Sequence, residues 1–250
     1  MADDLIQLAD ALVAQAAPGE QIEVLVSRST RTSVRVYGGE VESLTSADSS
    51  GAGVRVIRDG RLGFAHCGSL DPGVLADTLA EARDNCAFGE PDECNGLAEP
   101  DGVPVVARDA WADAVVSNPV DRKVELALEL ERRVLGLDPR VTGARSTSFG
   151  DAWGESAIVS TAGVRGVDRG ASCSVSTQPL AHHDGATQTG FAHDGGRDPA
   201  ALDLERVAAE AVERATRLLG ATKPPSGRLT IVLEPRLAMT LLGIVSGMLA

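Results

Sequence analysis

Apolar and polar residues alternate between residues 34 and 66, and this pattern constrains the fold more than any other feature of the sequence. Two blocks carry the alternation, Val34–Ser43 and Gly51–His66, with a short polar stretch between them. A period close to two is typical of half-buried strands, because successive side chains of a strand point to opposite faces. Asp59-Gly60 divides the second block and favours a tight hairpin turn, in which both central residues have positive φ. The blocks therefore predict an antiparallel meander.

Helical patterns flank the meander and return later in the chain. An apolar stripe, an Asp N-cap or a Pro in the first turn marks them. The predicted helices are Asp3–Gln15, Asp71–Ala87, Val120–Leu135 and Asp198–Leu219. Further period-two stretches predict strands at Ile22–Ser27, Val141–Phe149, Ser156–Ser160, Val164–Val167 and Ser172–Thr177, followed by a glycine-rich loop at His182–Gly190. The expected fold class is α+β.

Two short sequences recur in the same order. Arg28-Ser29-Thr30 returns as Arg145-Ser146-Thr147, and Gly63-Phe64-Ala65-His66 returns as Gly190-Phe191-Ala192-His193. Each tetrapeptide precedes a helix that begins with Pro, so we interpret the repeats as the trace of a duplication. The expected architecture is two related helix–antiparallel meander–helix units, residues 1–90 and 118–222. Residues 91–117, which have almost no periodicity, are the predicted linker.

The end of the sequence predicts a further domain. A Pro-Pro linker at residues 223–227 precedes a predicted strand, Arg228–Glu234, and an apolar helix, Pro235–Ala250, which has no polar last turn and no C-cap. One strand and one helix are too little to bury their own core. We therefore expect residues 226–250 to begin a third, β-rich domain that continues in a longer chain.

Composition and charge argue against several kinds of partner and location. The chain has 250 residues and a net charge of −13 without a cluster of Lys and Arg, so neither nucleic acid nor an anionic membrane is an expected partner. The acidic N-terminus is unlike a signal peptide, and the apolar run Leu237–Ala250 is too short for a membrane span. Four cysteines occur without a CxxC pair, which favours a cytoplasmic protein with reduced thiols.

One cluster in the sequence has the chemistry of metal ligands. His182-His183-Asp184 and His193-Asp194 are close in sequence, and Cys173 precedes them on a predicted strand. Adjacent histidines on a strand point to opposite faces, however, and the chain has no HExxH-type helical pair. A polar hairpin tip is therefore the preferred interpretation. His66, at the end of a strand, is interpreted as structural.

No other motif assigns a reaction. Cys67 and Cys173 lie on predicted strands and are expected to be buried, while Cys86 and Cys94 flank the start of the linker. None of them has a base nearby in sequence to lower the pKa of its thiol. The chain lacks a GxSxG elbow, a dinucleotide-binding loop and a P-loop. We therefore assign no catalytic, cofactor-binding or metal-binding residue.

Several stretches, in their order and spacing, carry a family resemblance. They are Val24–Thr30, Gly39–Ser43, Gly53–Val56, Asp59–Ala65, Asp138–Val141, Gln188–Phe191, Arg214–Ala215, Leu218–Ala221, Gly227–Arg228 and Val232–Pro235. Together they resemble the N-terminal portion of the TldD/PmbA family of metallopeptidases, specifically its PmbA (TldE) branch. The resemblance implies that family members continue past residue 250 into a third domain.

The resemblance also implies where zinc would bind. In the TldD branch, an HExxxH motif lies on the helix after the strand that matches Arg228–Glu234; its histidines and a later cysteine bind zinc, and its glutamate activates water. Here that helix reads Leu241–Met248 without a histidine, and no histidine follows His193. The resemblance therefore implies a non-catalytic chain, with no cofactor of its own and with zinc expected in a TldD-like partner.

Three functions follow as hypotheses. The leading one is a non-catalytic subunit of a TldD/PmbA-type zinc metallopeptidase complex, which pairs with a TldD-like catalytic subunit or with itself and acts on unfolded or leader peptides. The second is a self-sufficient metal-dependent hydrolase that uses His182, His183 and His193. The third is a peptide-binding module without a role in proteolysis.

Overall fold

The computed structural model describes residues 2–103 and 109–249. Part of the predicted linker, residues 104–108, and the last residue of the predicted C-terminal helix, Ala250, therefore lie outside the described residues. The chain divides into two units, Met1–Leu219 and Gly220–Ala250. Within the described ranges, no helix is both long and apolar enough to cross a lipid bilayer.

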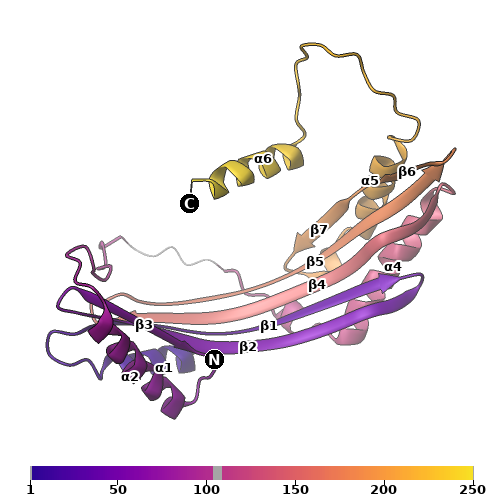
Figure 1. Cartoon of the computed structure of the whole chain (residues 1–250). Helices are drawn as coiled ribbons and strands as arrows, with labels where there is room; N and C mark the ends of the chain where they lie inside the picture. Colours follow the sequence, from indigo (N-terminus) through magenta and orange to yellow (C-terminus); the bar gives the residue numbers. More distant parts are fainter. Residues whose placement is uncertain (1, 104–108, 250) are drawn as a thin grey trace. The chain divides into compact units, whose positions relative to one another are not determined.

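One antiparallel sheet of seven strands organises the first unit (Figure 1). The strand order is β3-β2-β1-β4-β5-β6, and β7 also pairs with β5. The strands are β1 (Gln21–Tyr37), β2 (Glu40–Arg58), β3 (Arg61–Cys67), β4 (Val141–Ser160), β5 (Arg165–His183), β6 (Ala186–Thr189) and β7 (Ala192–Gly196). Asp59 and Gly60, with φ of 51° and 71°, form the predicted tight turn between β2 and β3. Helices and antiparallel strands thus confirm the α+β class.

The strands are longer than their sequence pattern indicates. Val141–Phe149 and Ser156–Ser160, predicted as separate strands, are parts of β4. Of the predicted His182–Gly190 loop, His182 and His183 belong to β5, and Ala186–Thr189 form β6. The polar stretch between residues 43 and 51 likewise lies inside β2. Gly150, Asp151 and Gly154 weaken the strand pattern locally, yet β1 and β5 pair with β4 on both sides through this stretch. Pairing with two neighbours overrides the local propensity.

Six helical segments accompany the sheet in the described part of this unit. They are α1 (Ala2–Val13), α2 (Pro72–Phe88), α3 (Asp113–Val116), α4 (Val120–Leu137), the 3₁₀ turn η1 (Pro199–Ala201) and α5 (Leu204–Thr216). Asp71 caps α2 as predicted, because its carboxylate accepts hydrogen bonds from Gly73 N and Val74 N. The predicted helix at 198–219 is wrong at its start. Asp198 caps only η1, and Asp203 begins α5 by accepting a hydrogen bond from Arg206 N.

Two hydrophobic cores lie on the same face of the sheet. Val24 and Val26 of β1 pack in the core that α1 and α2 cover. Val34 and Val36 of β1 pack in the core that α4 and α5 cover. These four residues are separated by even numbers of positions, so their side chains share one face. A buried glutamate, Glu131 of α4, accepts hydrogen bonds from the β1–β2 turn, at 3.0 Å from Gly38 N and 2.7 Å from Gly39 N.

The repeated tetrapeptides have the same geometry in both places. A Cβ atom on Gly63 would collide with the Ala82 carbonyl of α2, and a Cβ atom on Gly190 would collide with the Ala211 carbonyl of α5. On the opposite face, Phe64 stacks on His66 with ring centroids 6.0 Å apart, and Phe191 stacks on His193 at 5.8 Å. Gly63 of β3 and Gly190 of the β6–β7 connection each let a helix contact the backbone at that point, which explains why the sequence recurs next to a helix.

The described residues of the predicted linker are attached to the sheet. Asp92 N donates a hydrogen bond to Gly60 O at 2.9 Å, next to the β2–β3 turn. Ala171 N of β5 donates one to Ala110 O, also at 2.9 Å, so this part of the linker covers an edge of β5. The helix α3 lies within the same segment.

The second unit contains one helix, α6 (Pro235–Gly247), among its described residues. The predicted strand at Arg228–Glu234 is wrong, because this segment is irregular and mostly exposed. A strand requires a neighbour for its backbone hydrogen bonds, and the described residues of this unit supply none. Most apolar residues of α6, among them Leu242 and Met239, are exposed.

Candidate functional site

The sheet face opposite the two cores is exposed, and we call it the open face. Odd-numbered residues of β1 between Ser27 and Arg35 point to it, together with their partners across the strands. Small residues dominate its centre: Ser33 pairs with Gly150 and Gly150 with Ser174, and in a parallel row Ser29 pairs with Gly154 and Gly154 with Gly170. The backbone of the central strands is therefore accessible to a ligand here.

Four adjoining depressions follow the open face across the strands. Their volumes lie between about 280 and 520 Å³. Neighbouring depressions share lining residues: Ala152 and Ser172 join two of them, and Ser27 lies in two others. The depressions form one shallow band from His66 on β3 to Ser174 on β5. Such a band suits an extended chain better than a compact small molecule, which needs a concave cavity.

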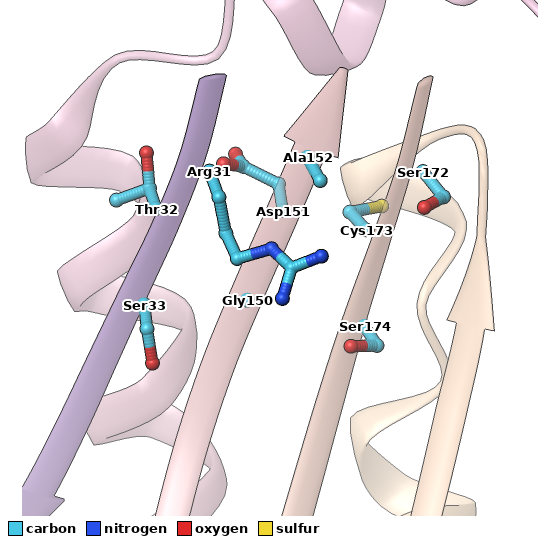
Figure 2. A pocket seen from close by; sticks show the side chains of 9 residues that line it. All are labelled: Arg31, Thr32, Ser33, Gly150, Asp151, Ala152, Ser172, Cys173 and Ser174. Carbon is cyan, nitrogen blue, oxygen red and sulfur yellow. The ribbon is translucent and has the colours of Figure 1, made fainter. Parts of the chain in front are cut away.

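Arg31 is the main charged residue of the depression at the β5 end of this band. Figure 2 shows its side chain reaching from β1 across β4 towards β5. Ser33 and Ser174 lie on either side of Gly150 in the same row. The depression measures about 280 Å³.

A buried ion pair lies beneath this depression, on the core side of the sheet. Lys123 Nζ of α4 is 2.7 Å from Asp151 Oδ2 and donates a hydrogen bond to Thr32 Oγ1 at 3.1 Å. The side chains of Lys123 and Asp151 are 9% and 5% exposed, so neither group reaches a ligand on the open face. The pair holds α4 on β1 and β4, because removing either partner would leave a buried charge.

The cysteines are not placed as nucleophiles. Cys173 is buried as predicted, and burial, reinforced by the negative charge of Asp151, raises the pKa of its thiol to about 11. A thiol with this pKa is protonated at neutral pH and reacts poorly. Cys86 is also buried, Cys94 is exposed, and Cys67 is only partly buried, less than the sequence predicts.

The structure does not bring His182, His183 and His193 together. His182 and His193 lie at positions along β5 and β7 about 20 Å apart, since Ser176, the partner of His193, is six residues from His182. His182 Nδ1 contacts Thr187 Oγ1 at 2.8 Å, and His183 Nε2 lies 3.3 Å from Asp184. Within the ranges 2–103 and 109–249, no three His, Cys, Asp or Glu side chains form a group that could hold a metal ion.

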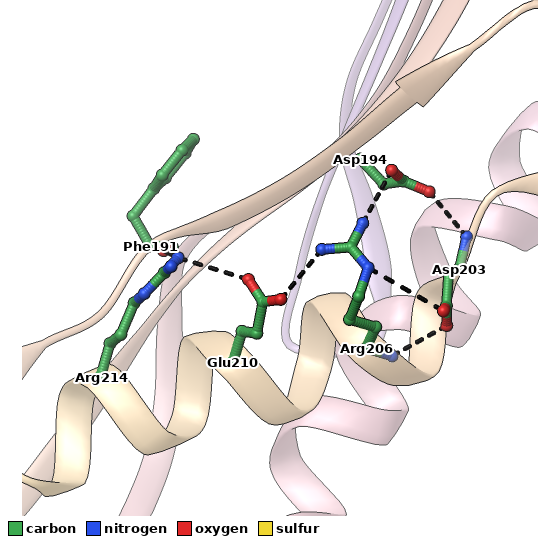
Figure 3. Close-up of polar contacts among 6 residues, drawn as sticks. All are labelled: Phe191, Asp194, Asp203, Arg206, Glu210 and Arg214. Atoms are coloured by element: carbon green, nitrogen blue, oxygen red, sulfur yellow. Dashed lines mark hydrogen bonds and ion pairs between the residues drawn. The ribbon is translucent and has the colours of Figure 1, made fainter. Parts of the chain in front are cut away.

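The carboxylate of Asp194, next to His193, contacts residues at the start of α5 (Figure 3). Arg206 Nη2 of α5 lies 2.7 Å from Asp194 Oδ1, and Asp203 N donates a hydrogen bond to Asp194 Oδ2 at 2.8 Å. Farther along α5, Arg214 donates a hydrogen bond to Phe191 O at 2.8 Å. This network fixes α5 on the second tetrapeptide, so Asp194, which the sequence suggests with His193 as a possible metal ligand, has a structural role.

The residues of the open face were not predicted from the sequence. Serines and glycines in its centre resemble turn residues when read locally. One signal was available: Ser27 and Ser29, and likewise Ser172, Ser174 and Ser176, alternate with other residues at the strand period. Arg31 and Ser174 lie 143 positions apart, and only the strand register places them together.

Family comparisons agree with these observations. Residues 22–86 match the model of PmbA/TldA metallopeptidase domain 1, and residues 115–219 match that of the PmbA/TldA metallopeptidase central domain. Metalloprotease PmbA of Escherichia coli O157:H7 is 27% identical over 91% of this chain and 51% of its own length. The Metalloprotease PmbA homolog of Haemophilus influenzae is 27% identical over 52% of this chain and 29% of its own. The chain spans about half the length of the first of these relatives.

Solved structures share the fold. A candidate modulator of DNA gyrase from Bacteroides thetaiotaomicron superposes with a TM-score of 0.85 at 23% identity, over 96% of this chain and 56% of that one. TldE from Thermococcus kodakarensis gives a TM-score of 0.70 at 20% identity, over 85% of this chain and 47% of that one. Two family models cover most of the sequence in the order of the predicted units. The chain belongs to the PmbA/TldD family of metallopeptidases.

Proposed function

We propose that this chain is a non-catalytic subunit of a zinc metallopeptidase complex, in which a TldD-like partner supplies the metal and the water-activating glutamate. One observation carries the proposal: the helix α6, where the resemblance implies an HExxxH motif, contains no histidine. Its residues between Leu241 and Met248 are apolar or small and offer neither a zinc ligand nor a general base.

The open face suits a role in holding the substrate. An unfolded or leader peptide in extended conformation needs a long and shallow surface, and the band of depressions crosses β2, β1, β4 and β5. Small side chains along the band let a peptide backbone approach the strands. Among the described residues, the open face holds no nucleophile paired with a base, which supports placing the chemistry in the partner.

Purification with and without a TldD-like protein from the same organism tests the proposal. The expected result is that the two proteins copurify and cleave an unfolded peptide, and that a chelator abolishes the cleavage. This chain alone is expected to cleave nothing. As a control, a Glu→Gln change in the HExxxH motif of the partner removes the activity without disrupting the complex. Robust zinc-dependent cleavage by this chain alone would refute the proposal, and failure to copurify would favour a peptide-binding module outside proteolysis.

A further inference from the structure

Arg31 places a guanidinium on the open face that has no partner among the described residues. Arg31 makes no side-chain hydrogen bond or ion pair with the part of the chain that the structure describes, and it is exposed. Two other cations of this face are neutralised: Arg35 Nε lies 2.6 Å from Glu42 Oε2, and Arg55 Nη2 lies 2.8 Å from Glu23 Oε1. Arg197, which lines the adjoining depression, donates a hydrogen bond to the Asp109 carbonyl, whereas the guanidinium of Arg31 remains available to a ligand.

Acidic groups are turned away from Arg31. Asp151 points to the core side, where Lys123 neutralises it. Asp168 pairs with Ser156, four residues along β4 from Ala152, which is the partner of Arg31. This displacement corresponds to about 13 Å along the strand. The depression is also lined by Asp151, but Lys123 neutralises this carboxylate on the core side, so Arg31 is the exposed charge of the depression.

Hydroxyl groups flank the guanidinium. Ser33 on β1 and Ser174 on β5 are both exposed, and Gly150 separates them on β4. A Cβ atom built on Gly150 would lie 3.9 Å from Ser174 Oγ, so this hydroxyl borders the space that Gly150 leaves open. Figure 2 shows Arg31 extending over this space. The two serines stand about 10 Å apart across two strand spacings, one on each side of the space over Gly150.

We propose that Arg31, Ser33 and Ser174 form a subsite for a carboxylate of an extended peptide. A guanidinium can donate two parallel hydrogen bonds to a carboxylate, and Ser33 or Ser174 can donate another. One cation and neutral donors match a monoanion, whereas phosphate sites in proteins usually add further cations or a helix N-terminus. The inference rests on the proposed function only in taking a peptide as the carrier of the carboxylate.

Peptide binding to the isolated chain tests the subsite without partner or zinc. The chain is titrated into a fluorescent unstructured peptide with a free C-terminal carboxylate, and binding is followed by fluorescence anisotropy. The same peptide with a C-terminal amide is the neutral comparison. A third peptide, with a C-terminal amide and an internal Glu, shows whether a side-chain carboxylate also binds. We expect a carboxylate-bearing peptide to bind about tenfold more tightly than the neutral amide. Arg31→Gln should abolish this preference and leave binding of the amide unchanged, and Arg31→Lys should retain part of it. Inorganic phosphate should compete poorly.

Arg132→Gln is the matched control, because it removes the same charge from an exposed position on α4 and should preserve the preference. Equal affinity for acid and amide peptides, no binding of either, or a preference that survives Arg31→Gln would overturn the subsite. A clear carboxylate preference without cleavage in the presence of a TldD-like protein would instead contradict the proposed function and leave the subsite standing.

Discussion

Gly63 and Gly190 show how one residue type decides a packing contact. Gly63 lies in β3 and Gly190 between β6 and β7, and a Cβ atom at either position would collide with helix backbone atoms. We expect Gly63→Ala and Gly190→Ala each to lower the free energy of unfolding by about 2 kcal/mol or more, because backbone must shift to make room. Urea denaturation measures the change.

Gly96→Ala serves as the control, since nothing lies within 4 Å of a Cβ atom at that position. It should change the stability by less than about 0.5 kcal/mol. If Gly63→Ala unfolded at the same urea concentration as the control, the close contact between β3 and α2 would be contradicted.

Glu20 links stability to pH. Its carboxylate accepts hydrogen bonds from Arg83 Nε at 2.9 Å and from Ala17 N at 2.9 Å, and the hydrogen bond with Arg83 holds the pKa of Glu20 below its usual value. Because the folded-state pKa is the lower one, the stabilisation is present above the unfolded-state pKa and is lost as the pH falls through the folded-state pKa.

We therefore expect Glu20→Gln to lower the free energy of unfolding by about 1–3 kcal/mol at pH 7. At about pH 3 the free energies of unfolding of the variant and the parent chain should differ less. Urea denaturation at both pH values measures this. Glu125→Gln, which removes an exposed ion pair with Arg122 on α4, should cost less than about 1 kcal/mol. An equal effect of Glu20→Gln at both pH values would show that the charge of Glu20 is not what stabilises the fold.

At the scale of elements, the two ends of β2 have different environments. Residues 52–57 pair with both β1 and β3, whereas residues 40–51 pair only with β1 among the described residues, and Glu40–Ser50 is exposed on both faces. We expect alternate amides of residues 40–51 to exchange with deuterium much faster than those of residues 52–57, because their N–H groups face solvent. Uniform protection along β2 in the isolated chain would contradict this and would indicate that another strand covers the edge.

The sequence predicted elements well where their signals are local. The turn at Asp59-Gly60 and the cap of α2 at Asp71 depend on neighbouring residues, and both have the predicted geometry. The full length of β4 depends on its pairing with β1 and β5, which no local pattern around Gly150 and Gly154 indicates. The prediction of a strand at Arg228–Glu234 was wrong for the converse reason: the strand pattern is present in the sequence, but no described strand lies beside it to pair with.

The candidate site was harder to predict than the fold. Ser33, Gly150 and Ser174 come from three strands, and each is an ordinary residue until the register aligns them. The histidines that the alternative hypothesis would use are separated, because closeness in sequence along β5, β6 and β7 does not give closeness in space. His182 and His193 are attached to different strands and make different local contacts.

At the scale of the whole molecule, one sheet carries two cores on one face and an exposed band of small residues on the other. Family membership, the helix α6 without histidine and this open face together motivate a subunit that holds peptide while a partner cleaves it. This account predicts that zinc binds to the TldD-like partner and not to this chain.

Metal analysis by inductively coupled plasma mass spectrometry tests this central claim most directly. We expect one zinc per TldD-like subunit in the purified complex and less than one tenth of an equivalent, roughly background, on this chain alone. Stoichiometric zinc on this chain alone, lost on His182→Ala, would contradict the account and favour a self-sufficient metal-dependent hydrolase.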